Sequence, residues 1–171
     1  MGEFSLRRLA ASDLEALTAA YRRNRDALAE WEPLRDEVFF TDVGQEEALR
    51  RRMEASDAGI AAPYVILRES AIVGLFNIGA IERGAFSNGR LGYWVDDEQR
   101  GRGLATWAIG ALVDEARTRL SLHRLEAATL LHNVPSQRAL RSNGFEEIGH
   151  ARAYLQIAGR WQDHILFQRI L

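Results

Sequence analysis

The sequence contains neither cysteine nor lysine. Without cysteine, it offers no disulfide framework, no thiolate metal site and no cysteine nucleophile. No apolar run approaches the roughly 18 residues of a membrane-spanning helix, and the first residues lack the basic-then-apolar pattern of a secretory signal. We therefore expect a cytoplasmic protein that does not associate with membranes.

The charge balance narrows the possible partners further. The 22 basic residues, all arginine, face 24 acidic residues, and a net charge of −2 argues against broad nucleic-acid binding. The four histidines form no closely spaced pair, so no metal site is expected. A length of 171 residues with 47% hydrophobic residues predicts one globular domain, residues 1–171.

Hydrophobic periodicity predicts a mixture of strands and helices in the order β-α-α-β-β-β-α-β-α-β-β. Strands are expected at residues 3–9, 63–67, 71–81, 90–95 and 125–130, with a closing hairpin of residues 145–157 and 161–170. A first helix is expected from a capping box of Ser12 and Glu15 to a point before Pro33. Further helices are expected at residues 45–55, 104–120 and 134–142. This order predicts an α/β (α+β) fold, a mixed sheet with helices on its faces.

The most informative segment is the glycine-rich turn at residues 97–105, DEQRGRGLA, between an expected strand and an expected helix. Such a turn presents several backbone N–H groups to a phosphate, and the helix N-terminus adds a partial positive charge. It differs from a P-loop because Leu104 and Ala105 occupy the positions of Lys and Ser or Thr. It also lacks the third glycine of a dinucleotide fingerprint. The residues alone allow either a phosphate site or a simple tight turn.

Several segments resemble the GNAT superfamily of N-acetyltransferases. Arg100-Gly101-Arg102-Gly103-Leu104-Ala105 is similar to its acyl-CoA pyrophosphate loop. LGYWV at 91–95, GRGLAT at 101–106, HNVPSQRALRSNGF at 132–145 and AGRWQDHILF at 158–167 resemble the RimJ/RimL-like branch, which acetylates protein N-termini. The opening LRRLAASD is similar as well, so the resemblance spans essentially the whole chain.

The resemblance implies a fold and a cofactor. The GNAT fold is a mixed, mostly antiparallel sheet of six to seven strands with about four helices on its faces. Its central strands, here ending near Val95 and Leu130, splay apart around the pantetheine arm. The implied cofactor is acetyl-CoA, bound by Val95, Arg100, Gly101, Arg102, Gly103, Ala105, Thr106, Asn133 and Ser136.

Ser136 is the residue for which the resemblance implies a catalytic role. It matches a hydroxyl that protonates the CoA thiolate, while a backbone N–H near residues 94–96 would stabilise the oxyanion. Asn133 and Ser136 also stand at the start of an expected helix, where simple capping explains both residue types. The resemblance further implies that Asn24, Arg25, Trp31 and Glu32 shape the acceptor pocket. Trp94 is expected to line the cleft and Tyr93 to lie in the core.

The general base is not identified by the sequence. Some RimL-like enzymes carry a Glu on the first strand of the closing hairpin, but the matching residue here is Leu155. Three alternatives remain: Glu82 or Asp96 acting through water, His150 titrating near neutrality, or an acceptor amine that arrives neutral. The last suits an α-amine, whose pKa is roughly 7.7–8.0. For Asp163, a structural hydrogen bond is expected rather than contact with the substrate.

These observations predict an acetyl-CoA-dependent N-acetyltransferase that acts by direct transfer in a ternary complex. The expected acceptor is a primary amine, foremost a protein or peptide N-terminal α-amine. Alternatives are a small-molecule amine acetyltransferase, a non-catalytic acyl-CoA-binding module, suggested by Leu155, and a nucleotide-binding regulatory domain that holds ATP. Many relatives are dimers, which leaves a homodimer open.

Overall fold

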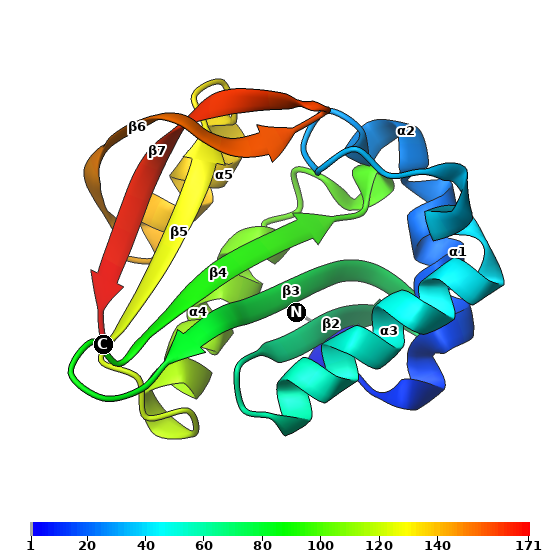
Figure 1. Ribbon diagram of the computed structural model, residues 1–171. Coiled ribbons are helices and arrows are strands. Elements are labelled where there is room, and N and C mark those ends of the chain that lie inside the picture. Colours follow the sequence, from blue (N-terminus) through cyan, green and yellow to red (C-terminus); the bar gives the residue numbers. More distant parts are fainter. Residues whose placement is uncertain (1) are drawn as a thin grey trace.

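The computed structural model describes residues 2–171 and contains a seven-stranded sheet in the order β1-β2-β3-β4-β5-β7-β6 (Figure 1). All neighbouring strands are antiparallel except β4 and β5. The expected mixed, mostly antiparallel sheet is therefore confirmed. The strands are β1 (Phe4–Arg8), β2 (Ala62–Arg68), β3 (Ala71–Glu82), β4 (Asn88–Val95), β5 (Arg124–Leu130), β6 (Glu146–Ile157) and β7 (Arg160–Ile170).

The helices lie on both faces of this sheet. They are α1 (Leu14–Arg23), α2 (Arg25–Leu28), α3 (Asp42–Asp57), α4 (Leu104–Thr118) and α5 (Val134–Ser142), with 3₁₀ turns at Ala11–Asp13, Glu37–Phe40 and Asp97–Gln99. Within residues 2–171, no helix combines the length and the apolar character that crossing a membrane would require.

The expected single helix from Ser12 is wrong at its start and in its middle. Asp13, and not Ser12, precedes α1, and its side chain does not cap that helix. Its carboxylate instead accepts the Ala10 N–H at 2.8 Å and pairs with Arg7 at 2.6 Å. Asn24 leaves the helical conformation, with φ −98° and ψ 8°, and separates α1 from α2. Its buried side chain instead donates to the Asp96 carboxylate and accepts the Asp97 N–H, just after the end of β4. The local sequence gives no sign of these tertiary contacts.

The alternation of side chains along β2 and β3 builds two cores. Tyr64 and Ile66 join α4 and α5 in one cluster, whereas Val65, between them, belongs to a cluster with α1 and α3. Successive strand residues point to opposite faces, so the two helix pairs cover opposite sides of the sheet. Figure 1 shows α4 behind β4 and α3 in front of β2.

β4 and β5 separate halfway along their length. Their parallel pairing runs from Asn88↔Arg124 to Leu91↔Ala127 and then stops. Beyond that point β4 pairs only with β3, and β5 only with β7. Figure 1 shows the two strands converging near the C-terminus and opening toward α2. The expected splay of the central strands is thus confirmed.

Asp96 ties the open end of β4 to α1. Its carboxylate accepts hydrogen bonds from Arg23 at 2.6 and 2.8 Å and from Asn24 at 3.0 Å. Burial would raise the pKa of Asp96, but the bonds from Asn24 and Arg23 outweigh it and hold that pKa below its ordinary value. A carboxylate with a lowered pKa stabilises the fold above its unfolded pKa and loses that contribution as pH falls.

We expect Asp96→Asn to lower the free energy of unfolding by about 3 kcal/mol at pH 7, because it breaks a buried, hydrogen-bonded ion pair. Urea denaturation measures this difference. The difference should begin to shrink below about pH 4, where this carboxyl becomes protonated in the unfolded chain, and should disappear as pH falls through the lower pKa of the folded state. Asp97→Asn, at an exposed neighbour, is the control and should stay within about 0.5 kcal/mol of wild type. Equal losses in both variants would contradict this account of Asp96.

Candidate active site

The turn between β4 and α4 is built to hold an anion. Gly101 and Gly103 both have φ of 75°, a conformation that side chains rarely adopt. Within residues 2–171, none of the N–H groups of residues 101–106 donates to a backbone oxygen. These free donors stand at the N-terminus of the 15-residue α4. Free N–H groups and the helix dipole together fit a pyrophosphate.

The two arginines of this turn lie in different surroundings. Arg100 pairs with Asp97 at 2.8 Å and lines the cavity beside the turn. Arg102 pairs with Glu3 at 3.4 Å and is not part of the cavity lining. Both side chains are about half exposed. Arg100 is therefore the better placed of the two to contact a bound phosphate.

A cavity of about 450 Å³ extends from this turn between β4 and α5. It brings together all the residues expected to bind the cofactor except Arg102. Gln99, Leu104 and Pro135, which were not among the residues expected to bind the cofactor, also line it. The expected residues in its wall are Val95, Arg100, Gly101, Gly103, Ala105, Thr106, Asn133 and Ser136.

A second cavity, of about 340 Å³, lies on the other side of the β4 edge. The two cavities share part of their walls, so they are two ends of one cleft that passes between the splayed strands. The shared residues are Trp31, Tyr93, Trp94, Asn133 and Ser136. The expectation that Trp94 lines the cleft therefore agrees with the structure.

The junction of the two cavities holds a pair of hydroxyl groups. The Tyr93 hydroxyl lies 2.7 Å from Ser136 Oγ, and the Tyr93 ring stacks on Phe76 at 5.0 Å. Burial raises the pKa of Tyr93 to about 12, so its hydroxyl stays protonated. The partly buried Tyr93 ring packs against the core, and its hydroxyl reaches the cleft. Its position in the sequence gives no sign of this contact, which joins β4 to α5.

Asn133 has a structural role that the sequence suggested. Its side-chain oxygen accepts the backbone N–H of Ser136 at 3.2 Å and caps α5. This bond fixes the first turn of α5, which carries Ser136 into the cleft. The cap uses only the side-chain oxygen of Asn133, so its side-chain NH₂ group can donate hydrogen bonds to a ligand.

The free edge of β4 supplies a candidate oxyanion donor. The Asp96 N–H donates to Val73 O at 2.9 Å, so it is engaged with β3. Bonds to one neighbour alternate along an antiparallel strand, and the N–H of Val95 therefore points the other way, toward the space left by β5. Of the three residues 94–96, Val95 is thus the one whose backbone N–H faces the cleft.

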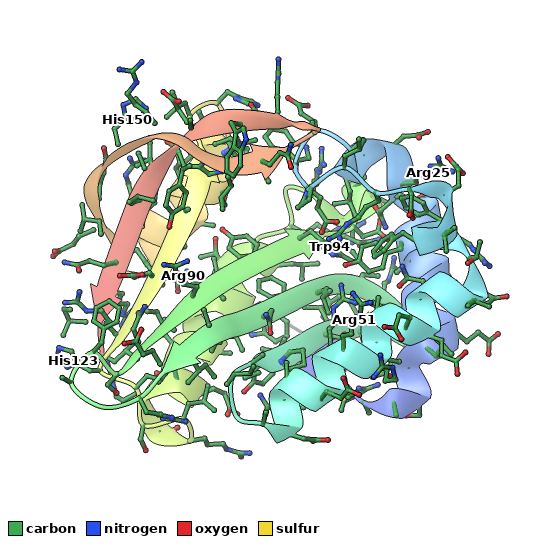
Figure 2. All side chains as sticks on the ribbon, in the orientation of Figure 1. Arg25, Arg51, Arg90, Trp94, His123 and His150 are labelled. Carbon is green, nitrogen blue, oxygen red and sulfur yellow. The ribbon has the colours of Figure 1, made fainter. Side chains whose placement is uncertain are left out.

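The proton acceptors considered from the sequence all lie away from the cavity walls. Glu82 ends β3 beside Asn88, where β4 begins, and Asp96 is held by its bonds to α1. His150 pairs with Asp163 at 3.0 Å on the outer strand, and Figure 2 shows it far from Trp94. Leu155 does line the second cavity but carries no proton acceptor.

Asp163 has the structural role expected of it. Its carboxylate accepts the Ala153 N–H at 2.9 Å and pairs with His150. Both contacts hold β7 to β6 near the point where the register between the two strands shifts. The bond from the Ala153 backbone, together with His150, keeps the pKa of Asp163 below its ordinary value.

Glu32 is the carboxylate that the structure places in the cleft. Within residues 2–171 it is the only Asp or Glu in the walls of the two joined cavities. Its side chain is 20% exposed, and burial raises its pKa, a shift that Arg35 and Arg52 oppose. Sequence reasoning placed Glu32 near the acceptor but assigned it no chemistry.

Comparisons with known proteins agree with this geometry. Residues 3–146 match the acetyltransferase (GNAT) domain family. The chain is 33% identical to the ribosomal protein uS5-alanine N-acetyltransferase of Escherichia coli, over 90% of this chain and 80% of that protein. It is 30% identical to the probable N-acetyltransferase YjcK of Bacillus subtilis, over 93% of this chain and 89% of that protein.

Solved structures show the same relationship. A ribosomal-protein-S5-alanine acetyltransferase from Vibrio fischeri superimposes with a TM-score of 0.93 at 34% identity, covering 98% of this chain and 93% of that one. Mycobacterium smegmatis RimJ, solved with CoA-disulfide, gives a TM-score of 0.92 at 30% identity, covering 98% of this chain and 81% of that one. The chain belongs to the GNAT acetyltransferase family, is of the RimJ/RimL-like kind, and uses acetyl-CoA as its acetyl donor.

Proposed function

We propose that this protein acetylates the α-amine at the N-terminus of a protein or peptide, by direct transfer in a ternary complex. The observation that carries the proposal is the continuous cleft, which has a phosphate-binding turn at one end and a separate cavity at the other. The Tyr93–Ser136 pair stands where the two meet. Two reactants that enter from opposite ends would meet at this point without a covalent enzyme intermediate.

Each functional residue has one task in this reaction. Bound acetyl-CoA supplies the activated acyl group. The N–H groups of residues 101–106 and Arg100 hold the pyrophosphate end, and the Val95 N–H donates to the carbonyl oxygen as negative charge develops. Ser136 donates its hydroxyl proton to the departing sulfur. Tyr93, which stays protonated, orients Ser136 through their hydrogen bond.

The second cavity supports a peptide amine better than a polycationic amine. Arg35 and Arg52 line it beside the single carboxylate of Glu32. Two guanidinium groups repel a chain of ammonium groups but can bind the carbonyl oxygens of a peptide. The names of the Escherichia coli and Vibrio fischeri relatives, which specify ribosomal-protein alanine, point to the same acceptor class.

Acetyl-CoA should raise the melting temperature of the protein. At about 100 times its Kd, a ligand adds about 2.7 kcal/mol of stability, which corresponds to several degrees for a domain of this size. Differential scanning fluorimetry measures the shift, with ATP at the same concentration as the control. A shift of equal size with ATP would indicate a nucleotide site and contradict the assignment of the turn.

Peptides with a free N-terminal alanine should be acetylated faster than N-terminally blocked peptides with an internal lysine. The α-amine has a pKa of about 7.7–8.0 and the lysine amine one near 10.4, so far more of the α-amine is neutral at pH 7.5. Mass spectrometry after incubation with acetyl-CoA detects the product. The chain itself has no lysine, so an acetylated lysine can come only from the peptide. Faster acetylation of the blocked peptide would overturn the proposed acceptor.

Ser136→Ala should lower kcat by about 100-fold with little change in the KM for acetyl-CoA, because it removes a proton donor that acts at the departing sulfur. Tyr93→Phe should lower kcat by about tenfold, since it removes one hydrogen bond that orients Ser136. Steady-state kinetics measure both effects. Ser142→Ala, at the exposed end of the same helix, is the control. Unchanged turnover in Ser136→Ala would exclude the proposed role.

A further inference from the structure

The inference concerns the proton on the acceptor amine, and it rests on the proposed function. At neutral pH an α-amine is largely an ammonium ion, and it must lose a proton before it can attack a thioester. The sequence identifies no single base for this step, and the candidates that it suggested, Glu82, Asp96 and His150, do not line the cleft. The structure offers a different candidate from a different element.

We propose that Glu32 binds the acceptor ammonium and takes its proton. Within residues 2–171, Glu32 is the only carboxylate in the walls of the cleft, and it lies in the cavity opposite the phosphate-binding turn. Its neighbour Trp31 lines both cavities. The carboxylate is therefore on the side of the Tyr93–Ser136 pair from which the amine approaches.

The backbone of Glu32 is fixed by two separate elements. Its N–H donates to Leu28 O at 3.0 Å, and its C=O accepts the Ala158 N–H at 2.9 Å. The second bond joins the segment after α2 to the turn between β6 and β7, and Figure 1 shows these two segments side by side. A carboxylate on an anchored backbone is positioned for proton transfer more precisely than one on a free loop.

The surroundings suit a group that must exchange a proton. Burial raises the pKa of Glu32 because it disfavours the charged carboxylate, and the positive charges of Arg35 and Arg52 oppose that shift. The Arg35 contact is long, 3.8 Å, so the carboxylate is not locked in a tight ion pair. The other titratable groups in this cavity are Tyr21 from α1, Tyr93 from β4 and His164 from β7.

The proton balance of the reaction is then complete. Glu32 takes one proton from the ammonium, and the freed electron pair forms the C–N bond as the C–S bond breaks. The nitrogen loses a second proton when the amide forms. One proton reaches the sulfur through Ser136, whose hydroxyl is then restored, and the proton on Glu32 passes to solvent. The products are an acetylated amine, the CoA thiol and one proton.

Glu32→Gln tests the proposal because it keeps the shape of the side chain and removes the charge. We expect kcat/KM for an N-terminal alanine peptide to fall by about 10²–10⁴-fold at pH 7. Part of this deficit arises because the variant must wait for the neutral amine, which is about a tenth of an α-amine at pH 7 and most of it at pH 9. The deficit relative to wild type should therefore shrink by up to about tenfold between pH 7 and pH 9.

Two further measurements separate a catalytic role from a structural one. The thermal shift with acetyl-CoA should be unchanged in Glu32→Gln, and the variant should unfold at the same or a higher temperature, because it no longer buries a charge. Glu30→Gln, an exposed carboxylate two residues away that contacts His132, is the matched control and should have wild-type activity.

Several results would overturn the inference. If the wild-type enzyme is active and the Glu32→Gln variant is equally active, Glu32 is not the base, and the proposed function still stands. A deficit that stays constant with pH would show that Glu32 only shapes the pocket. The same pH signature in His164→Gln, with none in Glu32→Gln, would move the role to His164. A wild-type enzyme inactive on every amine would overturn the proposed function and this inference together.

Discussion

The structure depends on one constraint, the loss of pairing between β4 and β5 beyond Leu91 and Ala127. A strand edge inside a domain carries backbone groups that must find partners. Here those groups face a cleft rather than another strand. A ligand with its own donors and acceptors can complete the sheet at this point, which is why we propose that the acetyl-CoA arm and the acceptor meet beside the end of β4. The glycine-rich turn proposed to bind the pyrophosphate lies next to this edge, because β4 leads into residues 97–103 and then α4.

Two sets of contacts anchor the elements that border the cleft. Asp96 joins the end of β4 to α1 through Arg23 and Asn24. The Ala158 N–H joins the β6–β7 turn to the segment that carries Glu32. The sheet halves on either side of the splay are thus held by different elements, and neither contact fills the space between the strands. The side chains proposed to act in the reaction project from this frame into the cleft.

Much of this architecture could be predicted from the sequence, because the elements follow from residue types and spacings within short segments. The strands, the long helix α4 and the glycine turn follow from periodicity and backbone chemistry, and the cap of α5 by Asn133 follows from residue type. What could not be predicted depends on tertiary contacts. Asn24 interrupts a helix to reach the end of β4, Tyr93 brings its hydroxyl to Ser136, and Arg102 turns toward Glu3. Glu32 gains its place in the cleft only when the segment after α2 folds against the β6–β7 turn.

The most direct test of this account is a crystal structure with a bisubstrate compound, CoA joined through an acetyl bridge to the α-amine of an alanine peptide. The account predicts pyrophosphate on the N–H groups of residues 101–106, the sulfur beside Ser136 and the peptide in the cavity that contains Glu32. The peptide should run outward past Arg35 and Arg52. A peptide that leaves the cleft by another route, or a nitrogen far from both Ser136 and Glu32, would contradict it.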